Sequence, residues 1–255
     1  MVYQPSLLQK AGICLIFVLV SCTNILVPTV PVVRGLADKG DVGESAYHLL
    51  ASEKYRRMAV EIQFAPGMKP QDGTINNFLI FLKKHLDKPG GITVTLKQVG
   101  TIQKTKITTQ DADSFAVKNR VLYTEGDLIA LYIYFADAIS AKSWIGGVAY
   151  RNTSLIVFEK TILDNLKGSG TASLVKMETG VLEHETAHLL GLVNNGTPMI
   201  TNHEDASHKF HCSNRNCLMY HAMESTGLLN AAGKAVPLLD ANCIRDLKAH
   251  RKKQR

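Results

Sequence analysis

The sequence predicts an α/β fold with a small, irregular C-terminal subdomain. Short apolar runs typical of strands alternate with segments of helical periodicity as far as residue 193. The run Leu128–Phe135 is almost continuously apolar, which suits a strand buried on both faces. Beyond residue 196 the chain is rich in loop-forming residues until a last helical segment. With 255 residues, the chain is long enough for one domain with a substantial core.

The first half of the chain predicts two strands and two helices. Met58–Phe64 is a short apolar run closed by Pro66-Gly67, as expected for a strand that ends in a turn. Residues 73–87 repeat apolar side chains at helical spacing and stop before a proline and two glycines. Ile92–Val99 alternates as a strand does, and residues 110–123 favour a helix.

The second half predicts three strands and two helices. Leu128–Phe135 is followed by strands at Trp144–Tyr150 and Ser154–Lys160, and the glycines of the first would let another backbone approach closely. Residues 171–193 lack proline, carry apolar residues at helical spacing and end before Asn-Asn-Gly, which predicts a long helix. A last helix is predicted from about residue 238 to residue 248.

The N-terminus has the form of a secretory signal. Residues 11–20 are an apolar run after Lys10, too short to span a bilayer. The segment Leu19-Val20-Ser21-Cys22 resembles a bacterial lipobox, which implies lipidation of Cys22. An ordinary signal peptide or an uncleaved anchor are the alternatives, and each would place the domain outside the cytoplasm. We therefore expect an exported lipoprotein, anchored to a membrane on its periplasmic or cell-surface face.

These signals divide the chain into three parts. Residues 1–21 are the predicted signal peptide, and residues 22–48 mix Pro, Val, Gly and Asp without periodicity, as a tether would. Residues 49–255 are the predicted folded domain, with an upper part at 49–193 and a lower part at 194–255.

The charge distribution gives no sign of nucleic-acid binding. The net charge of +7 is modest and partly concentrated in the tail at residues 248–255. The tail carries no interleaved aromatic residues and belongs to no nucleic-acid-binding module. We therefore expect no nucleic-acid partner, and we expect a monomer.

The segment His184–Gly191 (HETAHLLG) predicts a metal site with a general base beside it. On a helix, His184 and His188 lie four residues apart on one face, close enough to bind one zinc ion. Glu185 is then placed to accept a proton from a zinc-bound water. A catalytic zinc takes three protein ligands, so one more is needed. The candidates from the residues are His203, His208, His211 and His221, with Asp205 and Asn194 as weaker options.

The same segment, together with residues 211–220, resembles the metzincin metallopeptidases and is most similar to the archaemetzincins. Their shared features here are H-E-x-x-H-x-x-G, a histidine just before a cysteine, four intervening residues, and then C-x-M. Gly191 matches the glycine at which the family's helix turns, and Met219 matches its methionine turn. Tyr220 resembles the tyrosine after that methionine in the matrixins. The resemblance implies a metzincin-like mixed, twisted sheet with a long active-site helix.

The family's spacing would place the third zinc ligand at Asn194, which is a poor ligand for zinc. We interpret residues 192–210 as an insertion that has moved the ligand along the sequence. His211 keeps the family's place before the cysteine, so it is the preferred third ligand, with His203 and His208 as alternatives.

The cysteines predict one disulfide and a single zinc ion. Outside the cytoplasm a disulfide would persist, and Cys212 with Cys217 is the natural short-loop pair. Archaemetzincins carry a downstream C-x-x-C for a second zinc, whereas only Cys243 is found downstream here. We therefore expect one catalytic Zn²⁺, a Cys212–Cys217 disulfide, and Cys243 as a small buried residue.

The resemblance also implies a strand that pairs with substrate. In metzincins the strand before the last sheet strand runs along the cleft, and the corresponding residues here are Gly146, Gly147, Val148, Ala149 and Tyr150. Main-chain hydrogen bonds would hold an extended peptide on this strand. An ordinary glycine-containing edge strand is the alternative.

The predicted function is zinc-dependent endopeptidase activity on peptide or protein substrates. Glu185 would act as general base, and Tyr220 would help to hold the oxyanion. A zinc amidohydrolase acting on cell-wall or other non-protein substrates would use the same residues. A non-catalytic zinc-binding surface lipoprotein is the third possibility, although a structural zinc needs no base beside its ligands.

Overall fold

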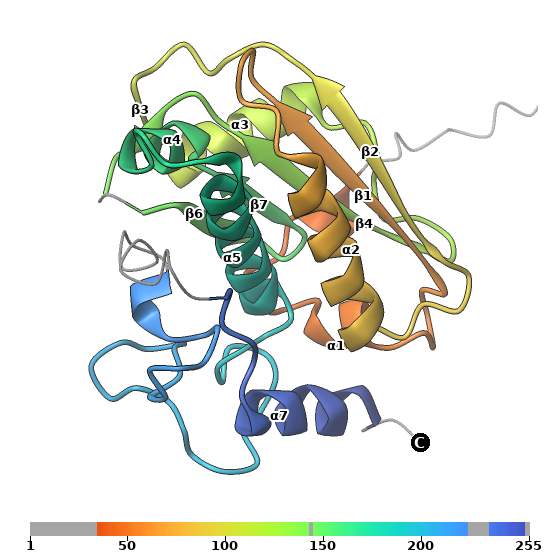
Figure 1. Cartoon of the computed structure of the whole chain (residues 1–255). Coiled ribbons are helices and arrows are strands. Elements are labelled where there is room, and N and C mark those ends of the chain that lie inside the picture. The colour runs from red at the N-terminus through yellow and green to blue at the C-terminus, as the bar shows by residue number, and fades with distance from the viewer. Residues whose placement is uncertain (1–34, 143–144, 224–234, 253–255) are drawn as a thin grey trace, which may run out of the picture. The chain divides into compact units, whose positions relative to one another are not determined.

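A five-stranded sheet in the order β2-β1-β4-β7-β6 carries helices on both faces (Figure 1). The structure is a computed structural model and describes residues 35–142, 145–223 and 235–252. The described residues belong to one compact unit. The fold is therefore the mixed α/β architecture that the sequence predicts.

The centre of the sheet is parallel. β1 (Arg57–Phe64) pairs in parallel with β2 (Ile92–Gln98) and with β4 (Leu128–Phe135). β7 (Ser154–Val157) continues the parallel order beside β4. β6 (Gly147–Arg151) pairs antiparallel to β7 and ends the sheet, so the sheet is mixed and has β6 as one edge.

Two cores lie on opposite faces of the sheet, because successive side chains of a strand point to opposite sides. Leu131 and Ile133 of β4 belong to one core, and Tyr132 and Tyr134 belong to the other. β4 is therefore buried on both faces, as its continuous apolar run predicts.

Helices α2 (Asp72–His85) and α5 (Thr171–Leu189) lie side by side over the first core (Figure 1). α3 (Thr109–Asn119) covers the second core, and a capping box between Thr108 and Asp111 fixes its start. The sequence predicts all three helices at these places.

Three short elements differ from the expectation. The predicted strand Ser154–Lys160 stops at Val157, because α4 (Glu159–Asn165) begins two residues later. β3 (Lys106–Ile107) and β5 (Ile139–Ser140) form a separate two-stranded sheet. Two residues are too few to show the alternation of apolar and polar residues by which a strand is predicted, so the sequence did not indicate these strands.

Part of the expected tether belongs to the folded body. η1 (Leu36–Asp38) lies within residues 22–48, and α1 (Ala46–Leu50) starts there. Leu50 of α1 is fully buried. The buried Asp38 carboxylate lies 3.2 Å from the Arg120 guanidinium and accepts hydrogen bonds from Thr124. The boundary predicted at residue 48 is therefore too late. Residues 1–34, including Cys22, lie outside the described residues.

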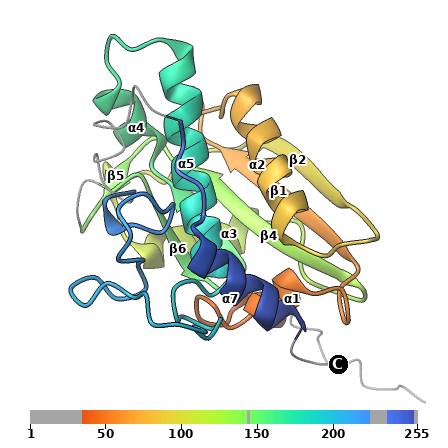
Figure 2. The same cartoon turned by 60° about the horizontal axis from the view of Figure 1, so that its bottom comes forward.

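The C-terminal part is irregular, as expected, until its last helix. η2 (His221–Met223) comes after a long loop region, and α7 (Ala241–Lys252) starts and ends a few residues after the predicted helix. α7 lies beside α1 (Figure 2), and the Arg251 guanidinium donates to the His85 carbonyl. Among the described residues, no helix is both long and apolar enough to cross a bilayer.

Candidate metal centre

Three histidine side chains meet at the end of α5. His184 and His188 come from its last turns, and His211 comes from the loop after the helix. All three are buried, and one nitrogen of each lies within 4.8 Å of the others. The Nε2 atoms of His184 and His188 are 3.1 Å apart. Ligands of a tetrahedral zinc with Zn–N bonds of about 2.05 Å are roughly 3.3 Å apart, so this donor set fits one zinc ion.

Backbone carbonyls orient all three rings. Nδ1 of His184 lies 2.7 Å from the Leu218 carbonyl, and Nδ1 of His188 lies 3.1 Å from the Leu192 carbonyl. His211 uses its Nδ1 in the same way, 2.9 Å from the Lys209 carbonyl. A ring that donates through Nδ1 carries its lone pair on Nε2, which is the arrangement found in metal-binding histidines.

A turn at Gly191 ends the helix at the site. α5 stops at Leu189, four residues before the predicted end, and Gly191 has φ of +80°. A Cβ at this position would collide with the Thr197 backbone nitrogen. The chain therefore needs glycine here, which agrees with the expected change of direction.

A backbone hydrogen bond brings His211 back to the helix. The Val193 N–H donates to the Phe210 carbonyl at 3.1 Å, so the chain returns next to the place where it left. Asn194, the position that family spacing would give to the third ligand, has φ of +55° at the start of this excursion. The excursion thus brings His211, rather than Asn194, to the two helical histidines.

The other candidate histidines lie in separate clusters. His203 is buried, with Nε2 2.7 Å from Asp246 and Nδ1 3.4 Å from the Cys212 sulfur. His208 is exposed and contacts Asp205 at 3.2 Å. The structure therefore brings neither His203 nor His208 to the cluster of His184, His188 and His211.

Glu185 faces the edge strand. Its Oε2 accepts a hydrogen bond of 2.9 Å from the Ala149 N–H of β6. A Cβ on Gly147 would lie 2.8 Å from the Glu185 Cγ and 2.8 Å from Val181, and a Cβ on Gly146 would also collide with Val181. These glycines therefore let β6 lie directly against α5. The predicted substrate strand is thus next to the carboxylate, with Val148 and Tyr150 on the same element.

Met219 and Tyr220 come directly after the residue that orients His184. Met219 is fully buried beside Leu218, whose carbonyl contacts His184. Tyr220 is half-buried, and its ring packs against His221 with centroids 4.3 Å apart.

The predicted disulfide between Cys212 and Cys217 is wrong. Among the described residues, Cys212, Cys217 and Cys243 are all free thiols. Cys217 also lies near the third thiol, since its sulfur is 3.7 Å from that of Cys243. Cys212 instead contacts His203 and Asp240, each at 3.4 Å.

Four residues form a second candidate metal-ligand cluster: His203, Cys212, Asp240 and Cys243. The Cys217 sulfur lies beside them, 3.7 Å from that of Cys243, and we call the five residues the thiol cluster. Hydrogen bonds from Cys212 and Cys243 lower the pKa of the Cys217 thiol, which favours its thiolate form. Thiolate is the form that binds metal. The sequence did contain a signal for the cluster, because Asp240 stands three residues before Cys243, where C-x-x-C would have its first cysteine.

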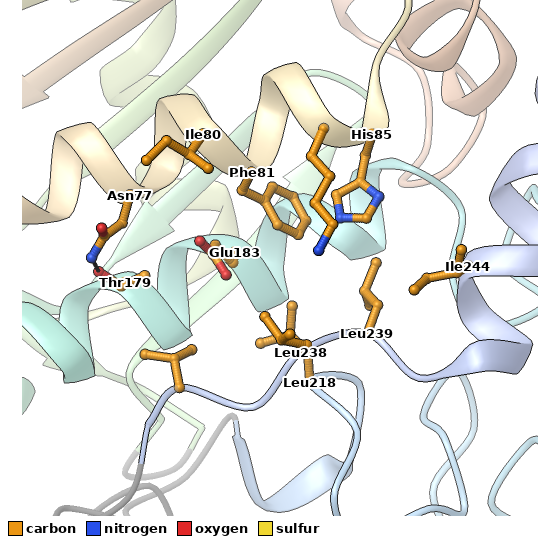
Figure 3. Close-up of a pocket in the computed structure, with 12 residues that line it drawn as sticks. Asn77, Ile80, Phe81, His85, Thr179, Glu183, Leu218, Leu238, Leu239 and Ile244 are labelled. Carbon is orange, nitrogen blue, oxygen red and sulfur yellow. Dashed lines mark hydrogen bonds between the residues drawn. The ribbon is translucent and has the colours of Figure 1, made fainter.

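A cavity of about 220 Å³ lies on the side of α5 that faces α2 (Figure 3). Phe81 of α2, Glu183 of α5 and the apolar side chains of Leu218, Leu239 and Ile244 line it. Burial raises the pKa of Glu183 to about 7. Leu218 thus contributes its side chain to this cavity and its carbonyl to His184.

Comparison with known proteins adds a likeness of fold. No family model matches the chain, and no curated protein matches it. The crystal structure of archaemetzincin from Methanopyrus kandleri is similar with a TM-score of 0.52 and 18% identity, over 77% of this chain and 97% of that one. Metalloproteinase-II from Bacteroides fragilis has a TM-score of 0.43 and 17% identity, over 86% of this chain and 58% of that one. We base the fold on the first structure: the chain has an archaemetzincin-like, metzincin-type fold.

Proposed function

We propose that this chain is a zinc-dependent endopeptidase whose catalytic ion is held by His184, His188 and His211. One observation carries the proposal: three buried imidazoles, each oriented by a carbonyl, converge beside a glutamate that an edge strand holds. The archaemetzincin-like fold supports the same conclusion, since the fold's named neighbour is a metzincin.

Zinc bound there would polarise a scissile carbonyl and lower the pKa of a bound water towards about 7. Glu185 would accept the proton of that water and deliver it to the leaving amine. The Ala149 N–H holds one Glu185 oxygen and so fixes the carboxylate's orientation. Tyr220, the residue after the turn beneath the site, is proposed to donate a hydrogen bond to the developing oxyanion.

An extended substrate would lie along β6. β6 is an edge strand of the sheet. It pairs antiparallel with β7 along one side, and among the described residues no other strand of the sheet pairs with its outer side. Its Val148 and Ala149 are half-buried, and Ala149 contacts Glu185. A peptide added to the outer side would therefore pass the general base, which fits binding by β-strand addition.

We also infer a second, structural ion in the thiol cluster, in addition to the one catalytic ion expected from the sequence. Cys212, Cys217 and Cys243 would supply three sulfur ligands, with His203 or Asp240 as the fourth. Such a set closes the coordination of zinc, as structural sites do. It would tie the loop before His211 to the start of α7.

Export and lipidation at Cys22 remain a proposal from the sequence alone. Metal in the thiol cluster is compatible with that compartment, because bound thiolates would be protected from the oxidation expected there. The proposed partners are thus a peptide substrate and the membrane that holds the lipid.

Replacing Glu185 with glutamine tests the proposed function. Glu185→Gln keeps the side chain's size and removes the base, so peptide-library cleavage should fall by about 10²–10⁴-fold while zinc content stays unchanged. Glu125→Gln, an exposed glutamate, is the matched control. The substrates should include cell-wall peptides, which would reveal an amidohydrolase.

Two results would contradict the proposal. One is that the Glu185→Gln variant cleaves peptides as fast as the wild type, which would show that Glu185 is not the base. The other is a wild-type protein that holds stoichiometric zinc yet cleaves neither the library nor cell-wall peptides, which would favour the non-catalytic, zinc-binding lipoprotein.

A further inference from the structure

A third cluster of metal-ligand side chains lies in the same irregular region. The rings of His208 and His221 stack with centroids 3.6 Å apart and an interplanar angle of 9°. Both point Nδ1 at one oxygen of Asp205, at 3.2 Å for His208 and 3.5 Å for His221. One ligand atom of each residue lies within 4.8 Å of the others.

Ordinary side-chain packing leaves one buried atom of this group, Nδ1 of His221, without a hydrogen bond among the described residues. The Asp205 oxygen accepts a hydrogen bond from His208, whereas Nδ1 of His221 is buried and forms no hydrogen bond among the described residues. If both rings were protonated, two stacked cations would face each other. A metal ion would instead use lone pairs of both rings together with the carboxylate charge.

We propose that Asp205, His208 and His221 bind an accessory divalent transition-metal ion. Two imidazoles and one carboxylate suit zinc, nickel or copper better than magnesium or calcium, which prefer oxygen ligands. The side chains are 18%, 45% and 29% exposed, so water can reach the ion and complete its coordination.

The site would brace the loop that carries His211. The Asp205 N–H donates to the His211 carbonyl at 2.8 Å, and the His211 N–H donates to the His208 carbonyl at 3.2 Å. His221 begins η2, directly after Met219 and Tyr220. An accessory ion would therefore link the loop of His211 to the segment after Leu218, whose carbonyl contacts His184.

This link predicts coupling between the two ions, and that part of the inference rests on the proposed function. Fixing the loop would hold His211 in place before the catalytic ion binds, which lowers the ordering cost of binding. Because coupling is reciprocal, each ion should raise the affinity for the other. Binding at the accessory site itself does not depend on peptidase activity.

The test is titration with Ni²⁺ of the full chain carrying two zinc ions, one for the cluster of His184, His188 and His211 and one for the thiol cluster, followed by calorimetry and native mass spectrometry. The wild type should take up one additional ion. His208→Gln and His221→Gln should each bind it more than about 100-fold more weakly, since losing a ligand costs more than the 10–100-fold typical of an outer-shell partner. Ser207→Ala is the matched control, because only the backbone N–H of Ser207 contacts Asp205.

Equal Ni²⁺ uptake by the wild type and both glutamine variants would overturn the proposal, as would no uptake by the wild type. Retention of the thiol-cluster metal and an unchanged circular dichroism spectrum check that the variants are folded. The same titration in Glu185→Gln separates the two proposals: the accessory ion should still bind when cleavage is lost. Coupling is measured by the rate at which a chelator removes the catalytic zinc, which should rise in both variants.

Discussion

At the scale of single residues, the third histidine decides how the site is assembled. The family's spacing would put the third ligand at Asn194, whereas the structure brings His211, the preferred candidate, to His184 and His188. The thiol cluster lies in the same region and holds His203, one of the other candidates. Two sets of candidate ligands that are neighbours in sequence thus belong to separate clusters.

Metal counting on single variants tests this separation. His211→Ala should lose one zinc ion and keep the other, because its ring belongs only to the α5 centre. Cys217→Ser should show the opposite pattern, since Cys217 lies among the other thiols. Zinc content is measured per chain by atomic emission, and peptide cleavage should depend only on the first ion.

Asn194→Gly is the control for the alternative ligand. The backbone of Asn194 has φ of +55°, which glycine adopts without strain. It should therefore retain both ions. Loss of the catalytic ion in Asn194→Gly, with its retention in His211→Ala, would reverse the assignment.

The local part of the site follows from sequence spacing, whereas the preference for His211 rests on its place before Cys212 and on the family resemblance. His184, Glu185 and His188 share one helical turn, so their spacing alone places them together. The position of His211 depends on how a loop closes, which periodicity does not encode. The thiol cluster was missed because Asp240 stands where a cysteine was expected, and the disulfide was inferred from two nearby cysteines without the third.

At the scale of elements, the contact between β6 and α5 positions Glu185, the proposed general base. Gly147 and Gly146 remove the side chains that would separate strand and helix. The Ala149 N–H can therefore reach Glu185. Long elements such as β4 and α5 were predictable from their apolar patterns. The contact between β6 and α5 depends on Gly146 and Gly147, and the sequence did not show which element packs against these glycines.

Gly147→Val tests this contact. The new side chain would meet Glu185 and Val181, so the carboxylate should shift and cleavage should fall by about 10²-fold. Overpacking should also lower the free energy of unfolding by about 1–3 kcal/mol. Gly100→Val is the control, because a Cβ at Gly100 meets nothing within 4 Å. Unchanged cleavage and stability in Gly147→Val would show that β6 does not position Glu185.

At the scale of the whole molecule, a buried pair of carboxyl groups joins three helices. Glu159 begins α4, and Glu178 lies on α5, where its carboxylate accepts hydrogen bonds from Gln71 and Thr74 at the start of α2. Burial, then the charge of Glu178, raises the pKa of Glu159 well above its usual value, and burial also raises the pKa of Glu178. The pair therefore holds protons in the folded state that the unfolded chain releases.

This pair makes stability depend on pH. Since its pKa values are raised in the folded state, its contribution is complete below about pH 4.5 and is lost as pH rises through the folded pKa. Glu159→Gln should flatten this decline, because the amide cannot release a proton. Urea unfolding midpoints at several pH values between about 5 and 9 measure the difference from the wild type. Glu53→Gln, an exposed glutamate, should keep the wild-type slope.

The hydrogen bond between Val193 and Phe210 bears on how well a sequence motif of fixed spacing can detect a ligand set of this kind. It closes a loop of sixteen residues, 194–209, directly before His211. Each doubling of a flexible loop costs only about 0.6 kcal/mol in closure entropy, so such an excursion is thermodynamically inexpensive. A motif of fixed spacing specifies the number of residues between ligands. Metal binding depends only on the distances between the ligand atoms in the folded chain. The proposed ligand set would therefore be invisible to a spacing rule while remaining evident in the fold.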